Sequence, residues 1–354
     1  MNFRDPVLIR HLSKSIASEA KGLPEMKLME VCGSHTQAVA RFGLRKLLPE
    51  NVKLVSGPGC PVCVTPSSEI AEAVWIAKKG AIVTTYGDLA RVPSSLGSLF
   101  EAKASGADVR VVYSIADAGE IARKNPGKKI VHVAIGFETT AQTTAAFLNS
   151  PPPKNFLVLN CHKWFLPAMD ALLASRDLKI DGYICPGHVS TLVGSDAYRF
   201  LSEKYEVAQV VAGFEPADVM LAVLMLVRQL KKGEGKVENE YIRVVKPGGN
   251  PRALKLMGET FGIGDAEWRG LGAIKDSGMP LTKRFEHFDA KKVLKPKVPR
   301  DAGMPKGCAC ASVLKGKTGP RDCRLFGKAC TPEKPIGPCM VSVEGACHNA
   351  LRFE

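Results

Sequence analysis

The sequence predicts an α/β protein with two parallel-sheet domains, followed by a loop-rich C-terminal region. Short apolar runs alternate with helical patterns through the first two thirds of the chain, and such alternation is typical of parallel sheets covered by helices. The tripeptide Gly-Phe-Glu ends two of the apolar runs, at 136–138 and 213–215. Two domains of similar structure would explain this repetition. After residue 285 the chain is rich in Pro, Gly, Lys and Cys. Such a segment cannot form a normal hydrophobic core, so we expect a metal centre to stabilise it.

The expected elements follow one another in a regular order. The expected strands cover residues 27–33, 52–57, 81–87, 109–114, 128–138, 156–163, 180–188 and 207–215. The expected helices cover residues 36–48, 67–80, 93–106, 116–125, 139–149 and 216–230. A proline-rich linker at 150–155 and a polar stretch after Lys231 divide the chain. We therefore predict two Rossmann-like α/β domains, at 1–150 and 151–245, and a C-terminal region at 246–354.

The composition is that of a globular protein, with 45% hydrophobic and 24% charged residues. No apolar run approaches the ~18 residues that a membrane span needs, so we expect no membrane association. The first residues lack the apolar core of a signal peptide, and we expect a cytoplasmic protein. Because the cytosol is reducing, the eleven cysteines indicate metal binding or redox chemistry rather than a disulfide framework.

The formal net charge is +14, which would suit an acidic protein partner or a nucleic acid. A lysine-rich solvated surface would give the same charge. The basic residues are spread along the chain, and aromatic residues make up only 6% of it. A stacking platform for single strands is therefore poorly supported, and we expect no nucleic-acid partner.

Polar motifs follow six of the expected strands. In open α/β sheets, sites form outside the carboxyl ends of the strands, so the six motifs predict a single cleft. They are CGSHT, GPGCPVC, TTYGD, GFETT, NCHK and CPGHVS.

The first of these motifs places Cys32 and His35 three residues apart at a strand-to-helix turn. A helix N-terminus and a nearby protonated imidazole would both favour the Cys32 thiolate. Cys32 is therefore a candidate nucleophile or soft metal ligand. The alternative is a buried cysteine at a strand end, followed by a helix cap at Ser34.

The second motif holds a Cys-x-x-Cys pair, Cys60 and Cys63, between glycines and prolines. Thr65 and Pro66 suit the start of a helix, so the pair precedes a helix dipole that stabilises thiolate. This spacing is typical of a reversible disulfide or of half a metal site. Since a zinc site needs a second such pair, which the sequence lacks, we favour redox chemistry or a ligand set shared with Cys32.

The C-terminal region offers six thiols to a metal centre. A cubane iron–sulfur cluster needs four thiolates, and the wide cysteine spacings, wrapped in Gly and Pro, favour a cluster over zinc. The candidates are Cys308, Cys310, Cys323, Cys330, Cys339 and Cys347.

Two further polar residues are candidate site groups: Glu138 in GFETT and His188 in CPGHVS. Each would equally serve as a structural residue with satisfied hydrogen bonds. The same ambiguity holds for the consecutive residues Cys161, His162 and Lys163. Asp88 would either help close the site or cap a helix. No phosphate-binding glycine motif occurs.

Taken together, these motifs resemble the HypD family of hydrogenase maturation factors. The resemblance is carried by CGSHT, GPGCPVCVTP, GFETTA, PGHVSTLVG and the tail FGKACTPEKPIGPCMVSVEGAC, and it extends from about residue 10 to 350. It implies two α/β domains and a C-terminal region that holds a [4Fe-4S] cluster. The family's Cys-x14-Cys-x6-Cys-x16-Cys pattern falls on Cys308, Cys323, Cys330 and Cys347, which leaves Cys310 and Cys339 as non-ligands.

The resemblance also implies a role. With the small partner HypC, the family forms the scaffold on which the Fe(CN)2CO unit of [NiFe]-hydrogenase is assembled, and HypE supplies cyanide as a thiocyanate on its own cysteine. The iron-site cysteine of the family matches Cys32, and its redox pair matches Cys60 and Cys63, beside the iron. The resemblance thus implies a monomer within heteromeric complexes, in which the cluster passes electrons to the dithiol. One departure is Gln37, where a second His often follows the Thr.

Two other classes of protein remain open from the sequence. The chain would also suit an iron–sulfur thiol-disulfide reductase that acts on protein substrates. A reductase of this kind would contain only the iron of its cluster. A scaffold for iron assembly would bind one additional iron when it is in complex with its partner. A basic iron–sulfur protein that binds nucleic acid is the third possibility, and its binding would weaken steeply with salt.

Overall fold

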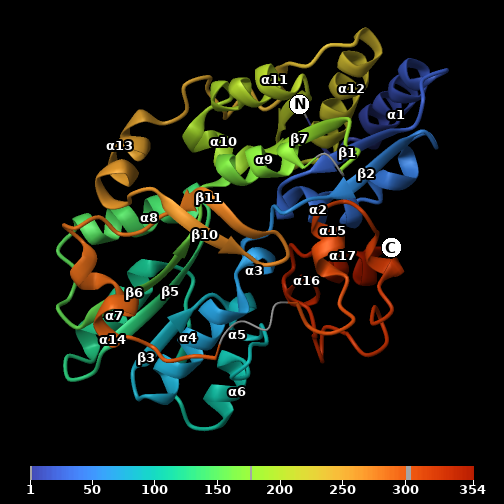
Figure 1. The fold of residues 1–354 in the computed structure, drawn as a ribbon. Coiled ribbons are helices and arrows are strands. Elements are labelled where there is room, and N and C mark those ends of the chain that lie inside the picture. The colour runs from blue at the N-terminus through green and yellow to red at the C-terminus, as the bar shows by residue number, and fades with distance from the viewer. Residues whose placement is uncertain (1, 176–177, 300–303) are drawn as a thin grey trace.

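The computed structural model describes residues 2–175, 178–299 and 304–354. Two parallel sheets form the body of the molecule, and the C-terminal segment packs beside the first of them (Figure 1). The predicted alternation of strands and helices is confirmed. In the part of the chain that the structure describes, no helix is both long enough and apolar enough to cross a bilayer.

Sheet A contains five parallel strands in the order β2-β1-β7-β8-β9. They are β1 (Met26–Glu30), β2 (Val52–Ser56), β7 (Gly182–Pro186), β8 (Ala208–Ala212) and β9 (Val237–Asn239). One face is covered by α1 (Pro6–Ala20) and α12 (Pro216–Lys232), which pack against each other. Helix α12 begins at a proline, where the missing N–H costs nothing, and ends before Gly233 in the left-handed region at φ 66°.

Sheet B contains four parallel strands in the order β4-β3-β5-β6. They are β3 (Ile82–Thr85), β4 (Val109–Val111), β5 (Ile130–Gly136) and β6 (Phe156–His162). One face packs on α7 (Ile115–Lys124), α8 (Glu138–Asn149) and α13 (Pro251–Thr260). The inner faces of both sheets share one large core, in which Met29 and Tyr183 of sheet A belong to the same cluster as Val133 of sheet B.

The two sheets divide the chain differently from the predicted boundary at residue 150. Strand β6 lies beyond that boundary and pairs with β5 along its whole length, from Ile130↔Phe156 to Gly136↔His162. Strand β1, in turn, pairs with β7 from the other side of the boundary. Sheet B is therefore inserted between the strands of sheet A, and the proline-rich linker is a connection inside sheet B.

The predicted C-terminal region also has two parts. Its first part holds α13 and an antiparallel hairpin of β10 (Gly264–Trp268) and β11 (Gly272–Gly278), which pack on α8 and α9 (Phe165–Ala174). Its second part carries the six cysteines and lies beside α2 (Gly33–Arg41) and α3 (Pro61–Val64) (Figure 1). Only the second part is loop-rich, as predicted.

The remaining helices are short and connect or cover these elements. They are α4 (Ser67–Lys78), α5 (Gly87–Ala90), α6 (Leu99–Ala104), α10 (Gly187–Val193), α11 (Arg199–Tyr205), α14 (Ala290–Leu294), α15 (Cys310–Leu314), α16 (Pro338–Val341) and α17 (Ala346–Phe353).

Candidate functional site

The six predicted motifs lie at strand ends, as expected, but on two sheets. CGSHT, GPGCPVC and CPGHVS follow β1, β2 and β7 of sheet A, while TTYGD, GFETT and NCHK follow β3, β5 and β6 of sheet B. Within each sheet the parallel register brings these ends to one edge, as in the pair Glu30↔Ser56. The thiol-bearing site is built on the edge of sheet A.

Cys32 stands at the junction between β1 and α2, where it is the N-cap residue with φ −140°. The loop after β2 crosses this junction closely: the Gly33 amide donates to the Gly59 carbonyl at 3.1 Å. A side chain at position 59 would place its Cβ 2.3 Å from the Cys32 backbone nitrogen. Glycine is therefore required at 59, and it brings the Cys-x-x-Cys segment against Cys32.

Cys60 is the N-cap residue of α3, and its Sγ accepts a hydrogen bond of 3.2 Å from the Cys63 amide. Both cysteines are buried, at 3% and 0% exposure. Pro61 follows Cys60 at the first helical position, where its fixed φ suits the turn. The pair thus occupies a rigid and solvent-shielded turn beside Cys32.

The helix N-terminus favours the Cys32 thiolate, as predicted, but burial opposes the thiolate more strongly in the chain alone. Burial raises the pKa of Cys32 to about 12, although the Ser34 and His35 amides favour the thiolate. Burial also raises the pKa of Cys60 and that of Cys63. The cost of desolvating an anion therefore exceeds the helix-terminus effect. A bound metal ion would replace these protons.

We expect slow alkylation of Cys32 as a consequence. A pKa increase from the usual 9.0 to about 12 lowers the thiolate fraction near neutral pH by about 1000-fold. Iodoacetamide should therefore modify Cys32 in the folded, reduced chain at least about 1000-fold more slowly than in urea. Quenched time points read by mass spectrometry measure both rates. Similar rates in the two states would contradict this account of the thiol.

The side chains of His35 and His188 both contact the ring of Phe214, and among the described residues the structure shows no contact of either with a cysteine sulfur atom. The ring of Phe214 stacks on His188 at 4.0 Å and lies 4.9 Å from His35. His35 Nε2 donates to the carbonyl of Gly213 at 2.9 Å, and burial lowers the pKa of His35 to about 4. The predicted protonated imidazole beside Cys32 is therefore wrong, because His35 is neutral in this buried position.

Glu344 is a site residue that the sequence reasoning missed. Its Oε1 accepts a hydrogen bond of 2.8 Å from Ser34 Oγ, and its negative charge contributes to the raised pKa values of Cys32 and Cys60. A Cβ at Gly33 would lie 2.5 Å from the Glu344 Cβ. Only the folded structure shows this contact, because 310 residues separate Glu344 from Ser34 in the sequence.

Asp88 helps to hold the C-terminal segment over the site, one of its two predicted roles. Its Oδ2 accepts hydrogen bonds from Ser342 Oγ at 3.1 Å and from the Val343 amide at 3.0 Å. The TTYGD motif of sheet B therefore anchors the segment that carries Glu344.

The four cysteines of the predicted cluster pattern line one small cavity in the C-terminal segment. The cavity is narrow, with a volume of about 10 Å³, and Leu325, Phe326 and Met340 form its apolar walls. Burial raises the pKa of Cys308 to about 11, and the nearby thiols act in the same direction. The lining cysteines are Cys308, Cys310, Cys323, Cys330, Cys339 and Cys347.

The donor atoms that line this cavity are those of cysteine thiols. Among the described residues, no three His, Cys, Asp or Glu side chains are grouped closely enough to hold one metal ion. That statement includes the predicted set of Cys32, Cys60 and Cys63. A cubane cluster takes four thiolate ligands, and the six cysteines that line this cavity include the four of the predicted pattern.

Cys310 and Cys339 lie between the cavity and the Cys-x-x-Cys turn. Their sulfur atoms are 2.8 Å apart, whereas a disulfide bond is about 2.05 Å long. The thiols of Cys339 and Cys63 are close enough for each to influence the pKa of the other. The sequence identified no role for these two cysteines, and the structure makes them the link between two thiol groups.

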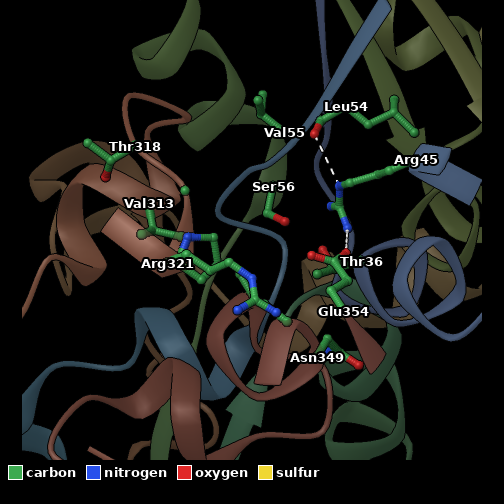
Figure 2. Close-up of a pocket in the computed structure, with 14 residues that line it drawn as sticks. Thr36, Arg45, Leu54, Val55, Ser56, Val313, Thr318, Arg321, Asn349 and Glu354 are labelled. Atoms are coloured by element: carbon green, nitrogen blue, oxygen red, sulfur yellow. Dashed lines mark hydrogen bonds and ion pairs between the residues drawn. The ribbon is translucent and has the colours of Figure 1, made fainter. Parts of the chain in front are cut away.

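A second cavity, of about 270 Å³, separates strand β2 from the C-terminal segment (Figure 2). Arg45 crosses its wall, donates to the Leu54 carbonyl at 3.3 Å and pairs with the side chain of Glu354. It also pairs with the fully buried Glu30 at 2.9 Å. Since Glu30 is two residues before Cys32, Arg45 fixes the C-terminal helix to the strand that carries the site.

We expect Arg45→Met to destabilise the protein by about 3 kcal/mol at pH 8, because it leaves Glu30 buried without its cation. Burial raises the pKa of Glu30 to about 7, above its usual 4.5. The protonated form is therefore favoured in the folded state, and its contribution to stability is lost as the pH rises through about 7. The effect of Arg45→Met should consequently be smaller at pH 5 than at pH 8.

Chemical denaturation at the two pH values measures this difference. Arg110→Met is the matched control, since Arg110 pairs with Asp108 at the surface and should cost at most about 1 kcal/mol. Equal losses for the two variants would contradict the role of Arg45.

The remaining candidates lie on the edge of sheet B. Lys163 is buried and forms an ion pair with Glu69 at 3.3 Å. His162 Nε2 forms a hydrogen bond of 2.9 Å with Thr144 Oγ1. These partners give both residues a structural explanation. Glu138 lines a separate cavity, and no described contact joins it to Cys32. The structure therefore does not bring Glu138 into the thiol site.

Comparison with known proteins identifies the family. A family model named HypD, described as "Hydrogenase formation hypA family", matches residues 7–354. A putative hydrogenase expression/formation protein of Methanocaldococcus jannaschii is 47% identical over 100% of this chain and 99% of its own length. The hydrogenase maturation factors HypD of Azotobacter vinelandii and Escherichia coli are 45% and 43% identical, over 98% of this chain and 94% and 95% of theirs. The chain therefore belongs to the HypD family of hydrogenase maturation factors.

Proposed function

We propose that this chain, with HypC, is the scaffold on which the Fe(CN)2CO unit of the [NiFe]-hydrogenase active site is assembled. The observation that carries the proposal is the clustering of thiols around the C-terminal segment. The Gly59 backbone packs against Cys32 and is followed by the Cys60–Cys63 turn, while Cys310 and Cys339, 2.8 Å apart, line a cavity together with the other four cysteines of that segment. We propose that these thiols connect a site for an iron substrate with a redox centre.

Cys32 is the proposed ligand for the iron that is being assembled. Its sulfur is soft and buried, and iron binding would displace the proton that burial retains. One protein thiol leaves most coordination positions free for cyanide, carbon monoxide and a ligand from HypC. We propose HypE as the transient donor of cyanide, and a monomer of this chain within these complexes.

Cys308, Cys323, Cys330 and Cys347 are the proposed ligands of a [4Fe-4S] cluster. When bound, such a cluster supplies electrons one at a time. The apolar side chains around the cavity, Leu325, Phe326 and Met340, would exclude water from it.

We propose that the thiols between the two centres undergo disulfide exchange. The thiol of Cys339, whose pKa is raised well above its usual value, would first lose its proton; its sulfur would then attack Cys63 of an oxidised Cys60–Cys63 pair and expel the Cys60 thiolate. Cys310, 2.8 Å from Cys339, would then attack Cys339 and release Cys63. The Cys310–Cys339 pair loses two electrons and two protons, and the Cys60–Cys63 pair gains them.

The burial of the dithiol argues against the alternative, a reductase of protein disulfides. Cys60 and Cys63 are 3% and 0% exposed, so a protein substrate cannot reach them without opening of the C-terminal segment.

We expect Cys60→Ser and Cys63→Ser to block hydrogenase maturation while the iron of the cluster remains. Differential alkylation followed by mass spectrometry tests the redox role in the unmodified chain, because it should find Cys60 and Cys63 bridged to each other after oxidation. If the two cysteines are never bridged and both variants still mature hydrogenase, the dithiol is only structural.

A further inference from the structure

A large apolar cavity lies away from these thiols. It has a volume of about 620 Å³ and is formed by the ends of α9, α10 and α13 together with the β10–β11 hairpin. Cavities of this size, with apolar walls and few polar groups, are typical of sites for small ligands. The lining residues are Glu138, Trp164, Leu166, Pro167, Val193, Ala197, Leu254, Ile263 and Asp276.

Glu138 is the buried polar group of this cavity. Its side chain is 1% exposed, and its Oε1 accepts a hydrogen bond of 2.9 Å from the amide of Phe165, at the start of α9. Its other oxygen, Oε2, is buried and has no hydrogen-bond partner among the described residues. Capping α9 needs only one acceptor oxygen. The second is costly to leave unpaired, so we expect a ligand to satisfy it.

The charge and shape of the lining indicate what that ligand is. Of the nine residues that line the cavity, two are carboxylates, Glu138 and Asp276, and none is basic. Trp164 is among the lining residues, and an indole attracts a cation that lies against its face. Asp276 has a left-handed backbone at φ 58°, a conformation that is unfavourable for a residue other than glycine.

An anionic ligand is disfavoured by both carboxyl groups. A neutral apolar ligand would fill the walls but would leave Glu138 Oε2 unpaired. A cation with an apolar body would satisfy the oxygen and the walls together. Burial raises the pKa of Glu138 to about 7, so the carboxylate is present in a substantial fraction at neutral pH, and a bound cation would increase that fraction.

We propose that this cavity binds a small organic cation, an ammonium group on an apolar body, with Glu138 as its counter-ion. The proposal concerns a site separate from the thiols and does not depend on the proposed assembly of the iron unit. Asp276 at the exposed end of the cavity would add to the attraction, and Leu254 and Ile263 would contact the apolar body.

The test uses a matched pair of probes, 2-phenylethylamine and 2-phenylethanol, with the full chain under anaerobic conditions at pH 8. Calorimetry and ligand-observed NMR measure their dissociation constants. We expect the amine to bind at least about tenfold more tightly than the alcohol, because only the amine forms a charged hydrogen bond. Glu138→Gln should remove this difference and leave the weak binding of the alcohol unchanged.

Two controls separate binding from folding. Glu203→Gln removes a carboxylate from the exposed face of α11 and should not alter binding of the amine. Leu254→Trp keeps Glu138 and fills the cavity, and it should weaken binding of both probes. The proposal is overturned if the wild-type chain binds neither probe, if amine and alcohol bind equally, or if Leu254→Trp leaves binding of the amine intact.

Discussion

Replacing Cys32 with alanine is expected to reduce hydrogenase maturation to background, while the iron of the proposed cluster remains. Cys32 is the thiol at the end of β1 against which the Gly59 backbone packs, and the proposal gives the iron substrate no other ligand from this chain. Alanine fits the space without new contacts, so the fold should survive. Hydrogenase activity in a deletion strain complemented with the variant measures the loss.

The control for this variant is Cys161→Ser. Cys161 is also buried at the end of a strand, at 3% exposure, but it lies on sheet B beside the Lys163–Glu69 ion pair. It should support maturation at close to the wild-type level. If Cys32→Ala supports maturation equally well, Cys32 is not the iron ligand.

The second large effect concerns the cavity of the C-terminal segment. Cys323→Ala should remove a ligand of the proposed cluster, so the iron content of the anaerobically purified chain should fall from about four to nearly zero. The brown colour should disappear with it. Iron analysis and visible absorption measure both changes.

Cys310→Ala is the matched variant, since Cys310 lines the same cavity but pairs with Cys339. It should keep most of the iron and still fail to mature hydrogenase, because the exchange between the cavity and Cys63 is broken. A colourless wild-type chain that contains stoichiometric zinc would contradict the assignment of the cluster.

The sequence was informative about local structure because local structure follows from periodicity. The apolar run at 128–138 predicted a strand, and β5 covers Ile130–Gly136 with every residue buried. The apolar run that follows Glu215 predicted a helix, and α12 is that helix. The alternation of such segments predicted parallel sheets, which the strand pairings confirm.

Strand partners could not be predicted in the same way. Nothing in the pattern of β1 distinguishes β7 as a neighbour, although the two strands pair as Glu30↔Ile184. Their adjacency depends on the packing of the whole chain. Because β1 and β7 are neighbours, the chain is not divided between the sheets at residue 150, where we predicted the boundary. The same limit applies to Glu344, whose contact with Ser34 closes the site from a distant segment.

The protonation states of the site thiols could not be predicted from the sequence either. Spacing placed Cys32, Cys60 and Cys63 at helix starts, which favours thiolates. The extent of burial decides the balance, and the C-terminal segment contributes to it where α16 packs against α3. The link from Cys63 to Cys339 likewise depends on how that segment docks.

Infrared spectroscopy of the chain co-purified with HypC under anaerobic conditions tests the central claim most directly. The account predicts stretching bands of iron-bound cyanide and carbon monoxide, together with one iron beyond the about four of the cluster. Both the bands and the extra iron should be absent from the Cys32→Ala complex. A wild-type complex without these bands, isolated from cells that are actively maturing hydrogenase, would contradict the claim that the iron unit is assembled on this chain.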